Sequence, residues 1–289
     1  MIRFGPSGNS ESFYAEGYKN TEQAASWLAQ KGLNAFEYSF GRGVRMTEKK
    51  AHLIREEFRR ADVAISAHAP YYINFANPEE EMVLKSIGYV LDTARAVQEM
   101  GGNRVVFHPA TVGKATREEA FRRTYDRILR LRDAIYEAGL QNVLFCPETM
   151  GKINQIGDLT EIAELCEIDP VFYPTIDFGH LNARTHGGLK TKADFETVVC
   201  VLRDHLPWEK VKNMHVHFSH IAYSEGGEVK HLTNADEEFG PFFEPLAEVL
   251  HQYDLTPVIL SESDGTQAED AQQMKQIYEA IQNFGRQSL

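Results

Sequence analysis

The strongest constraint on the fold is a repeat, in which short apolar runs alternate with amphipathic stretches from one end of the chain to the other. The short runs have the length and apolar character of buried strands, and each following stretch has the periodicity of a helix. The predicted strands are MIRFG, NAFEYS, DVAISAH, NRVVFH, QNVLFCPE, VFYPTID, KVKNMHVHF and PVILSE. The predicted helices cover residues 20–31, 47–61, 79–101, 116–139, 158–167, 191–206, 239–253 and 266–284.

Eight strand-helix units without a break are typical of a (β/α)8 TIM barrel, an α/β fold of about 250 residues. The chain has 289 residues and no Pro/Ser-rich linker, so we expect one barrel domain over residues 1–289. An open doubly wound sheet is the alternative. That fold usually carries a glycine-rich phosphate turn after its first strand, and FGPSGNS does not fit the pattern G-x-G-x-x-G.

Composition and charge restrict where the chain works and what it binds. No apolar run reaches the roughly 18 residues of a membrane span, and the N-terminus lacks the layout of a secretory signal, so a cytoplasmic protein without membrane contact is expected. The net charge of -12 argues against a nonspecific nucleic-acid binder unless a local basic patch exists. Cys146, Cys166 and Cys200 are too far apart to indicate a disulfide framework or a thiolate zinc site.

Six consecutive predicted strands carry histidine, aspartate or glutamate at their last residue or next to it. In a barrel of this type the C-terminal ends of the strands meet at one rim, where reactive groups lie. His215 and His217 point to the same side of their strand, and His217 is the predicted ligand because it lies nearer the rim. The rim residues are His68, His108, Glu148, Asp177 with His180 just past it, His217 and Glu262.

This collection of side chains indicates a metal centre. Carboxylates gathered in a partly desolvated site repel one another unless cations hold them. Imidazole nitrogen and carboxylate oxygen, without thiolate, suit zinc, manganese or iron, and shared carboxylates suggest more than one ion. Asp177 and His180 are then predicted to bind two different ions of one cluster.

The same residues carry a resemblance to a known family. In this order over nearly the whole chain, the motifs HAPYYIN, FHPA, PETM, DFGHLNA, HFS and KHLTN, with Glu262, resemble the endonuclease IV family of zinc-dependent apurinic/apyrimidinic endonucleases. The resemblance implies a zinc cluster at the rim of a (β/α)8 barrel. It also implies a monomer that hydrolyses the phosphodiester on the 5′ side of an abasic site in duplex DNA.

Matched motif by motif, the resemblance implies three zinc sites that share ligands. Glu148 would bridge the first two ions. Glu148 and Glu262 are the implied catalytic residues, because they hold the ions that activate water. The implied ligands are His68, His108 and Glu148 for the first ion, Glu148, Asp177, His217 and Glu262 for the second, and His180 and His231 for the third.

The sequence departs from the family pattern in the loop after the seventh strand. The family commonly has Asp-x-His there, whereas this chain reads Val229, Lys230, His231. Glu228 lies one position away and could substitute for the aspartate. We therefore expect two or three zinc ions, with the third bound more weakly, and manganese is a possible replacement for zinc.

The resemblance also implies residues that contact DNA. Tyr71 matches the aromatic residue that family members press into the duplex at the lesion, and Asn74 matches a neighbouring position. A wedge of this kind costs least where a base is already missing. Arg42 and Arg45, in the loop after the second strand, could contact phosphates, and a solvated surface charge is the equal alternative for each.

Two other functions fit parts of the same pattern. Sugar isomerases and epimerases share the barrel and typically bind one divalent ion, and the acidic net charge favours them. Their ion would leave four further imidazoles without a role. A noncatalytic protein with a structural metal fits less well, because structural zinc sites are normally closed and four-coordinate. The one-ion set would be Glu148, Asp177, His217 and Glu262.

Overall fold

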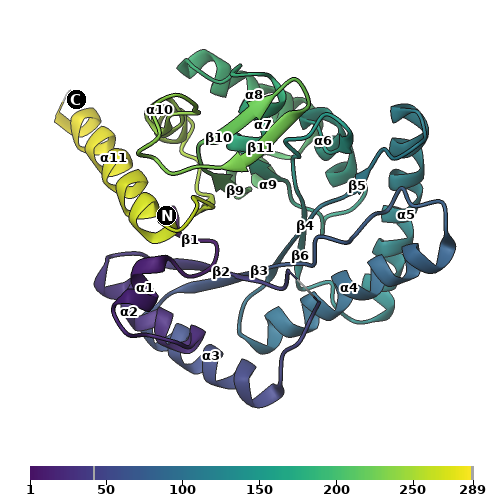
Figure 1. The fold of residues 1–289 in the computed structure, drawn as a ribbon, viewed down its shortest axis with the longest axis horizontal. Helices are drawn as coiled ribbons and strands as arrows, with labels where there is room; N and C mark the ends of the chain where they lie inside the picture. Colours follow the sequence, from purple (N-terminus) through teal and green to yellow (C-terminus); the bar gives the residue numbers. More distant parts are fainter. Residues whose placement is uncertain (42, 288–289) are drawn as a thin grey trace.

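The computed structural model describes residues 1–41 and 43–287, and it shows eight parallel strands arranged as a barrel (Figure 1). Each strand overlaps one of the eight predicted runs, so the predicted fold is confirmed. The strands are β1 (Arg3–Pro6), β2 (Ala35–Ser39), β3 (Ala64–His68), β4 (Arg104–Phe107), β6 (Leu144–Pro147), β8 (Thr175–Asp177), β9 (His215–Phe218) and β12 (Val258–Ser261).

The ring closes through contacts between two four-stranded halves. One half has the order β2-β3-β4-β6 and the other β8-β9-β12-β1, and every neighbouring pair is parallel. Parallel bridges join Ser7 to Glu37 and Glu148 to Thr175, which links β1 to β2 and β6 to β8. Because all eight strands run the same way, their C-terminal ends meet at one rim.

Helices cover the outside of the barrel, and the C-terminal helix lies beside β1 (Figure 1). Thr47, Thr116 and Asp158 begin three of them, each with a side-chain oxygen that accepts a hydrogen bond from a backbone N–H three residues on. The seventh predicted helix begins at Phe243, later than the pattern indicated. The helices are α2 (Ala24–Gln30), α3 (Glu48–Ala61), α4 (Glu80–Glu99), α5 (Arg117–Glu137), α6 (Leu159–Glu167), α8 (Lys192–His205), α10 (Phe243–Gln252) and α11 (Gln267–Gln287).

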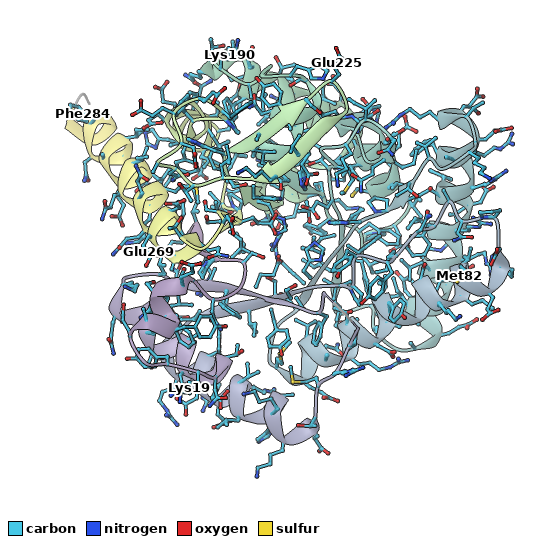
Figure 2. The ribbon with its side chains drawn as sticks, in the orientation of Figure 1. Lys19, Met82, Lys190, Glu225, Glu269 and Phe284 are labelled. Atoms are coloured by element: carbon cyan, nitrogen blue, oxygen red, sulfur yellow. The ribbon has the colours of Figure 1, made fainter. Side chains whose placement is uncertain are left out.

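Short elements that the periodicity did not predict lie in the loops between these units. The most extended is an antiparallel hairpin of β10 (Ile221–Ser224) and β11 (Gly227–His231), which follows β9 and packs on α7 (Phe178–Arg184). Glu225 lies at the turn of this hairpin, at the outer edge of the molecule (Figure 2). The others are α1 (Glu11–Ala15), β5 (Ala110–Thr111) and β7 (Gln155–Ile156). Two further elements fall within predicted ones: a 3-10 turn (Thr21–Gln23) forms the start of the predicted helix 20–31, and α9 (Trp208–Lys212) replaces the first residues of the predicted strand KVKNMHVHF.

The hydrophobic core lies mainly between the barrel and its helices. Phe36 of β2, for example, packs against Phe58 of α3 with ring centroids 5.5 Å apart. Inside the strands, however, several polar side chains are fully buried, among them Glu37, His215 and His217. Within the described residues, none of the helices has the length and apolar composition needed to cross a membrane. Buried polar groups in a barrel interior require hydrogen-bonding partners, and the partners of these side chains include residues at the C-terminal rim.

Candidate metal centre

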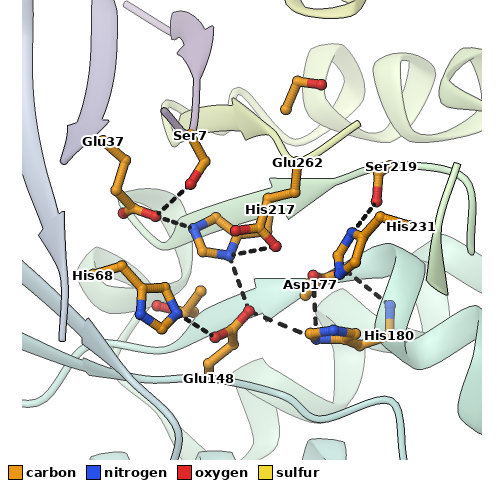
Figure 3. A network of polar contacts seen from close by, with 12 residues as sticks. Ser7, Glu37, His68, Glu148, Asp177, His180, His217, Ser219, His231 and Glu262 are labelled. Atoms are coloured by element: carbon orange, nitrogen blue, oxygen red, sulfur yellow. Dashed lines mark hydrogen bonds and ion pairs between the residues drawn. The ribbon is translucent and has the colours of Figure 1, made fainter. Parts of the chain in front are cut away.

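The structure gathers all eight predicted ligands at the C-terminal rim of the barrel, and Figure 3 labels all of them except His108. His68 ends β3 and Asp177 ends β8, while His217 lies within β9. These side chains, with Glu228, fall into three groups, in each of which the possible ligand atoms lie within 4.8 Å of one another. The groups are His68, His108 and Glu148, then Glu148, Asp177, His217 and Glu262, and finally His180, Glu228 and His231.

Glu148 belongs to the first two groups and uses a different oxygen for each. Its Oε2 lies 3.2 Å from Nε2 of His68 and 3.1 Å from Nε2 of His108. Its Oε1 lies 2.9 Å from Nδ1 of His217, and that nitrogen is 3.5 Å from Oε2 of Glu262. A carboxylate whose two oxygens face two ligand sets is suited to bridge two ions.

The third group shows which residue takes the place of the aspartate that the family pattern has at the position of Val229. Nε2 of His180 lies 3.4 Å from Oε2 of Glu228, so a glutamate takes the place where an aspartate two residues before the histidine was expected. In the hairpin, Ala222 pairs with Lys230 but Tyr223 pairs with Glu228, which leaves Val229 as the extra residue of a β-bulge.

This bulge decides which way the glutamate points. In a regular strand, residues three apart point to opposite faces, and one inserted residue restores them to the same face. Glu228 and His231 can therefore both face His180. A Cβ at Gly151 would lie 2.6 Å from Cβ of Glu228, so glycine at that position makes room for the glutamate.

Three of the candidate imidazoles share an orientation in which the protein holds Nδ1 and Nε2 faces the ligand group. Nδ1 of His68 lies 2.8 Å from the carbonyl of Ala69, and Nδ1 of His180 lies 2.9 Å from the carbonyl of Thr149. Nδ1 of His231 lies 2.9 Å from Oγ of Ser219. Such contacts fix the tautomer of a metal-binding histidine and leave Nε2 available in these three residues.

Charges at the rim raise the pKa values of His68, His180 and His217. Burial alone would lower the pKa of His68 and of His180, but the surrounding carboxylates raise each to about 9. Burial likewise disfavours charge on Glu148, yet His217 and a hydrogen bond from His108 hold the pKa of Glu148 well below its usual range. Without bound metal, protons on the imidazoles therefore compensate the negative charge of the carboxylates, as metal cations would when bound.

The arrangement passes a specific test for metal binding at Asp177. This residue is fully buried, and burial, reinforced by Glu262 and Glu148, raises its pKa to about 6. Its Oδ1 accepts a hydrogen bond from the backbone N–H of His180, whereas among the described residues none makes a hydrogen bond to Oδ2, which lies 3.1 Å from Nδ1 of His180. A buried oxygen without a donor, in a group of imidazoles and carboxylates, fits a divalent cation.

A cavity of about 220 Å³ opens onto the three groups and is also lined by Ser39, Gly41, Tyr71 and Lys152. Tyr71, a predicted DNA contact, is 57% exposed at this mouth. Lys152 is exposed there as well and was not foreseen, because it lies in the loop after β6 without a recognisable motif.

The other predicted DNA contacts lie elsewhere. The amide of Asn74 is used within the protein: it donates to Oγ1 of Thr111 and accepts hydrogen bonds from the backbone N–H groups of Ala76 and Thr111. Arg45 is exposed in the loop after β2, and Arg42 lies outside the described residues. Contacts of these residues with DNA stay predictions.

Glu37 is a residue of the centre that the sequence analysis missed. It is fully buried in β2, and its Oε1 lies 2.9 Å from Nε2 of His217 (Figure 3). His215 also faces it, with Nε2 3.0 Å from Oε2. The only available signal was a lone glutamate in the middle of the apolar run NAFEYS, where strand alternation alone cannot show which side is the barrel interior.

Comparison with known proteins places the chain among barrels of this kind. The family model described as xylose isomerase-like TIM barrel matches residues 25–284. The chain belongs to this family. An uncharacterized protein of Methanocaldococcus jannaschii is 34% identical to this chain over 241 residues, which is 83% of this chain and 86% of that protein. The resemblance seen in the motifs is thus confirmed at the level of the family.

The similar proteins whose names describe an activity are of two classes, endonucleases and sugar epimerases. The probable endonuclease 4 of Aquifex aeolicus is 27% identical over 122 residues, 42% of this chain and 43% of that protein. The structure of endonuclease IV from Thermus thermophilus aligns with a TM-score of 0.66 at 18% identity, over 91% of this chain and 93% of that one. A D-tagatose 3-epimerase-like protein aligns with a TM-score of 0.65 at 20% identity, over 91% and 93%. At these identities the structural matches show the fold alone.

Proposed function

We propose that this protein is a metal-dependent endonuclease of the endonuclease IV type, which hydrolyses the phosphodiester on the 5′ side of an abasic site in duplex DNA. The observation that carries the proposal is the presence of three adjoining ligand groups rather than one. A one-ion site would use only the group that contains Asp177. The imidazoles of His68, His108, His180 and His231 would then have no role. The sequence similarity to the probable endonuclease 4 of Aquifex aeolicus supports the same choice.

The residues present can perform the parts of such a reaction that belong to the protein. Lewis acidity at a phosphate and acidification of water are the chemistry that zinc or manganese ions supply when bound. Glu148 would hold two ions at a fixed spacing. Lys152, exposed beside the cavity, would contact a phosphate, and the exposed ring of Tyr71 would enter the space that a missing base leaves.

A sugar epimerase or isomerase is the second candidate, because three features favour it. The group of Glu148, Asp177, His217 and Glu262 would suffice for one ion. The cavity of about 220 Å³ is of a size for a small molecule, and the net charge of -12 opposes DNA binding over the surface as a whole. The number of ions per chain separates the two candidates.

The deciding experiment uses one metal-loaded preparation in two assays. We expect it to nick a duplex that carries a single abasic analogue, on the 5′ side of the lesion, and to leave the matched undamaged duplex intact. Metal analysis should give two to three ions per chain. Interconversion of ketose sugars without nicking, at about one ion per chain, would overturn the nuclease proposal in favour of the epimerase.

A substitution in the hairpin tests the third ligand group. Glu228→Gln should lower the bound metal by about one ion per chain, because it removes the charge of the carboxylate that faces His180. Loss of a metal ligand of this kind should weaken binding by at least about 10-fold. Metal content after dialysis against a graded zinc buffer measures the change.

Glu225→Gln is the matched control, because Glu225 is exposed at the turn of the same hairpin. It should bind metal like the wild type. If Glu228→Gln also keeps the full metal content across the zinc series, the third group does not bind an ion.

A further inference from the structure

Strand β2 supplies none of the predicted ligands, yet it carries the buried carboxylate of Glu37 beneath the centre. Four side chains converge on it. Oγ of Ser7 donates to Oε1 over 3.2 Å, and Oγ of Ser66 donates to Oε2 over 3.0 Å. Nε2 of His215 lies 3.0 Å from Oε2, and Nε2 of His217 lies 2.9 Å from Oε1. These contacts occupy about as many positions as a carboxylate offers.

The contact with His217 sets this histidine apart from the other candidate ligands. His68, His180 and His231 contact neutral oxygens through Nδ1 and present Nε2, although Nδ1 of His180 also lies 3.1 Å from Oδ2 of Asp177. His217 is reversed, because Nε2 lies 2.9 Å from Oε1 of Glu37, an ion-pair contact without hydrogen-bond geometry, while Nδ1 makes a hydrogen bond with Glu148 and faces Glu262. The ring could present Nδ1 to a cation only if that nitrogen carried no proton, so with an ion bound the proton would reside on Nε2, beside a carboxylate that can accept it.

The carboxylate of Glu37 is also held in place independently of the His217 imidazole. Ser66 belongs to β3 and Ser7 follows β1, so hydrogen bonds from both neighbouring strands hold the carboxylate. Full burial of a charge is costly, and an apolar side chain of similar size would fill the barrel at lower cost. The presence of the Glu37 carboxylate at this buried position is explained if His217 requires a negatively charged neighbour.

We infer that Glu37 is a positioning residue, which fixes the tautomer and orientation of His217 so that Nδ1 is directed at the ion held by Glu148, Asp177 and Glu262. The inference rests on the proposed metal centre, but it applies equally to a nuclease and to an epimerase. It adds one charged residue from β2, a strand without ligands of its own, to the residues that determine ion affinity.

The test is the affinity of that ion in Glu37→Gln, which keeps the shape of the side chain and removes its charge. We expect a loss of about 10- to 100-fold for one ion, the range that follows from removing the hydrogen-bonding partner of a metal-binding histidine. The visible spectrum of the cobalt-substituted protein should change for the same ion. The affinity of the ion bound by His68 and His108 should change by a smaller factor, because Glu37 makes no direct contact with that group and acts on His68 only through its charge.

Ser66→Ala provides a second, milder variant that removes one hydrogen bond to Glu37 without altering its charge. It should lower the affinity for the same ion by a smaller factor. Circular dichroism checks that Glu37→Gln is folded. If the folded variant binds all ions with wild-type affinity and spectrum, the role of Glu37 is overturned while the proposed metal centre is not. A wild-type protein that takes up no zinc, manganese or cobalt would instead overturn the metal centre itself.

Discussion

Glu148→Gln is expected to reduce cleavage of the abasic duplex by at least about 1,000-fold, a change that corresponds to about 4 kcal/mol in the barrier. Both oxygens of Glu148 face ligand groups, one toward His68 and His108 and the other toward His217. The substitution therefore removes charge from two ion sites at once. Single-turnover nicking, together with metal analysis of the same samples, measures the effect.

Glu167→Gln is the control for this substitution, because Glu167 is an exposed carboxylate at the end of α6 that pairs with His205. It should cut at the wild-type rate. The folded state of Glu148→Gln is checked by circular dichroism. If this variant is folded and nicks the duplex as fast as the wild type, Glu148 does not bridge ions that serve the reaction.

Removal of metal should reverse the dependence of stability on pH between about 6.5 and 9. In the metal-free protein, carboxylates raise the pKa of His68 and of His180 from 6.5 to about 9, and they raise that of His217 as well. The folded state then binds more protons than the unfolded state across this window. The free energy of unfolding should therefore be greatest near its lower end and decline as pH rises toward 9.

With zinc in excess the sign is opposite, because ions and protons compete for the same nitrogens and metal binding strengthens as pH rises. At a free ion concentration about 1,000 times Kd, binding adds about 4 kcal/mol to the free energy of unfolding. Urea unfolding of chelator-treated and zinc-loaded protein at several pH values compares the two. Parallel pH profiles of equal height would show that the rim residues do not bind the metal.

The sequence predicted the barrel because the pattern repeats eight times, so errors at individual ends did not affect the whole. It predicted the rim ligands for a related reason. In parallel strands that close into a ring, the last residues of all strands meet, and side chains such as His68 and Asp177 need no further information to be brought together.

The residues that were missed depend on local geometry that periodicity does not show. Glu37 lies in the middle of its strand, and only the closed ring reveals that it faces His217. Glu228 was named as a possible substitute for the expected aspartate, but the reason that it faces His180 was not predicted, because it is the bulge at Val229, which changes the face on which a side chain lies without any change in composition. The hairpin itself was not predicted, because both of its strands fall within a loop between β9 and α10.

The hairpin of β10 and β11 allows the number of metal ligands at such a site to change independently of the barrel. The first two ligand groups are built mainly on barrel strands, whereas Glu228 and His231 both lie on this appended segment. It is attached to the loop after β6 by backbone hydrogen bonds, and Gly227 approaches so closely that a Cβ there would lie 2.2 Å from the carbonyl oxygen of Gly151. Exchange of one exposed module could thus add or delete an ion while the scaffold that folds the protein stays intact.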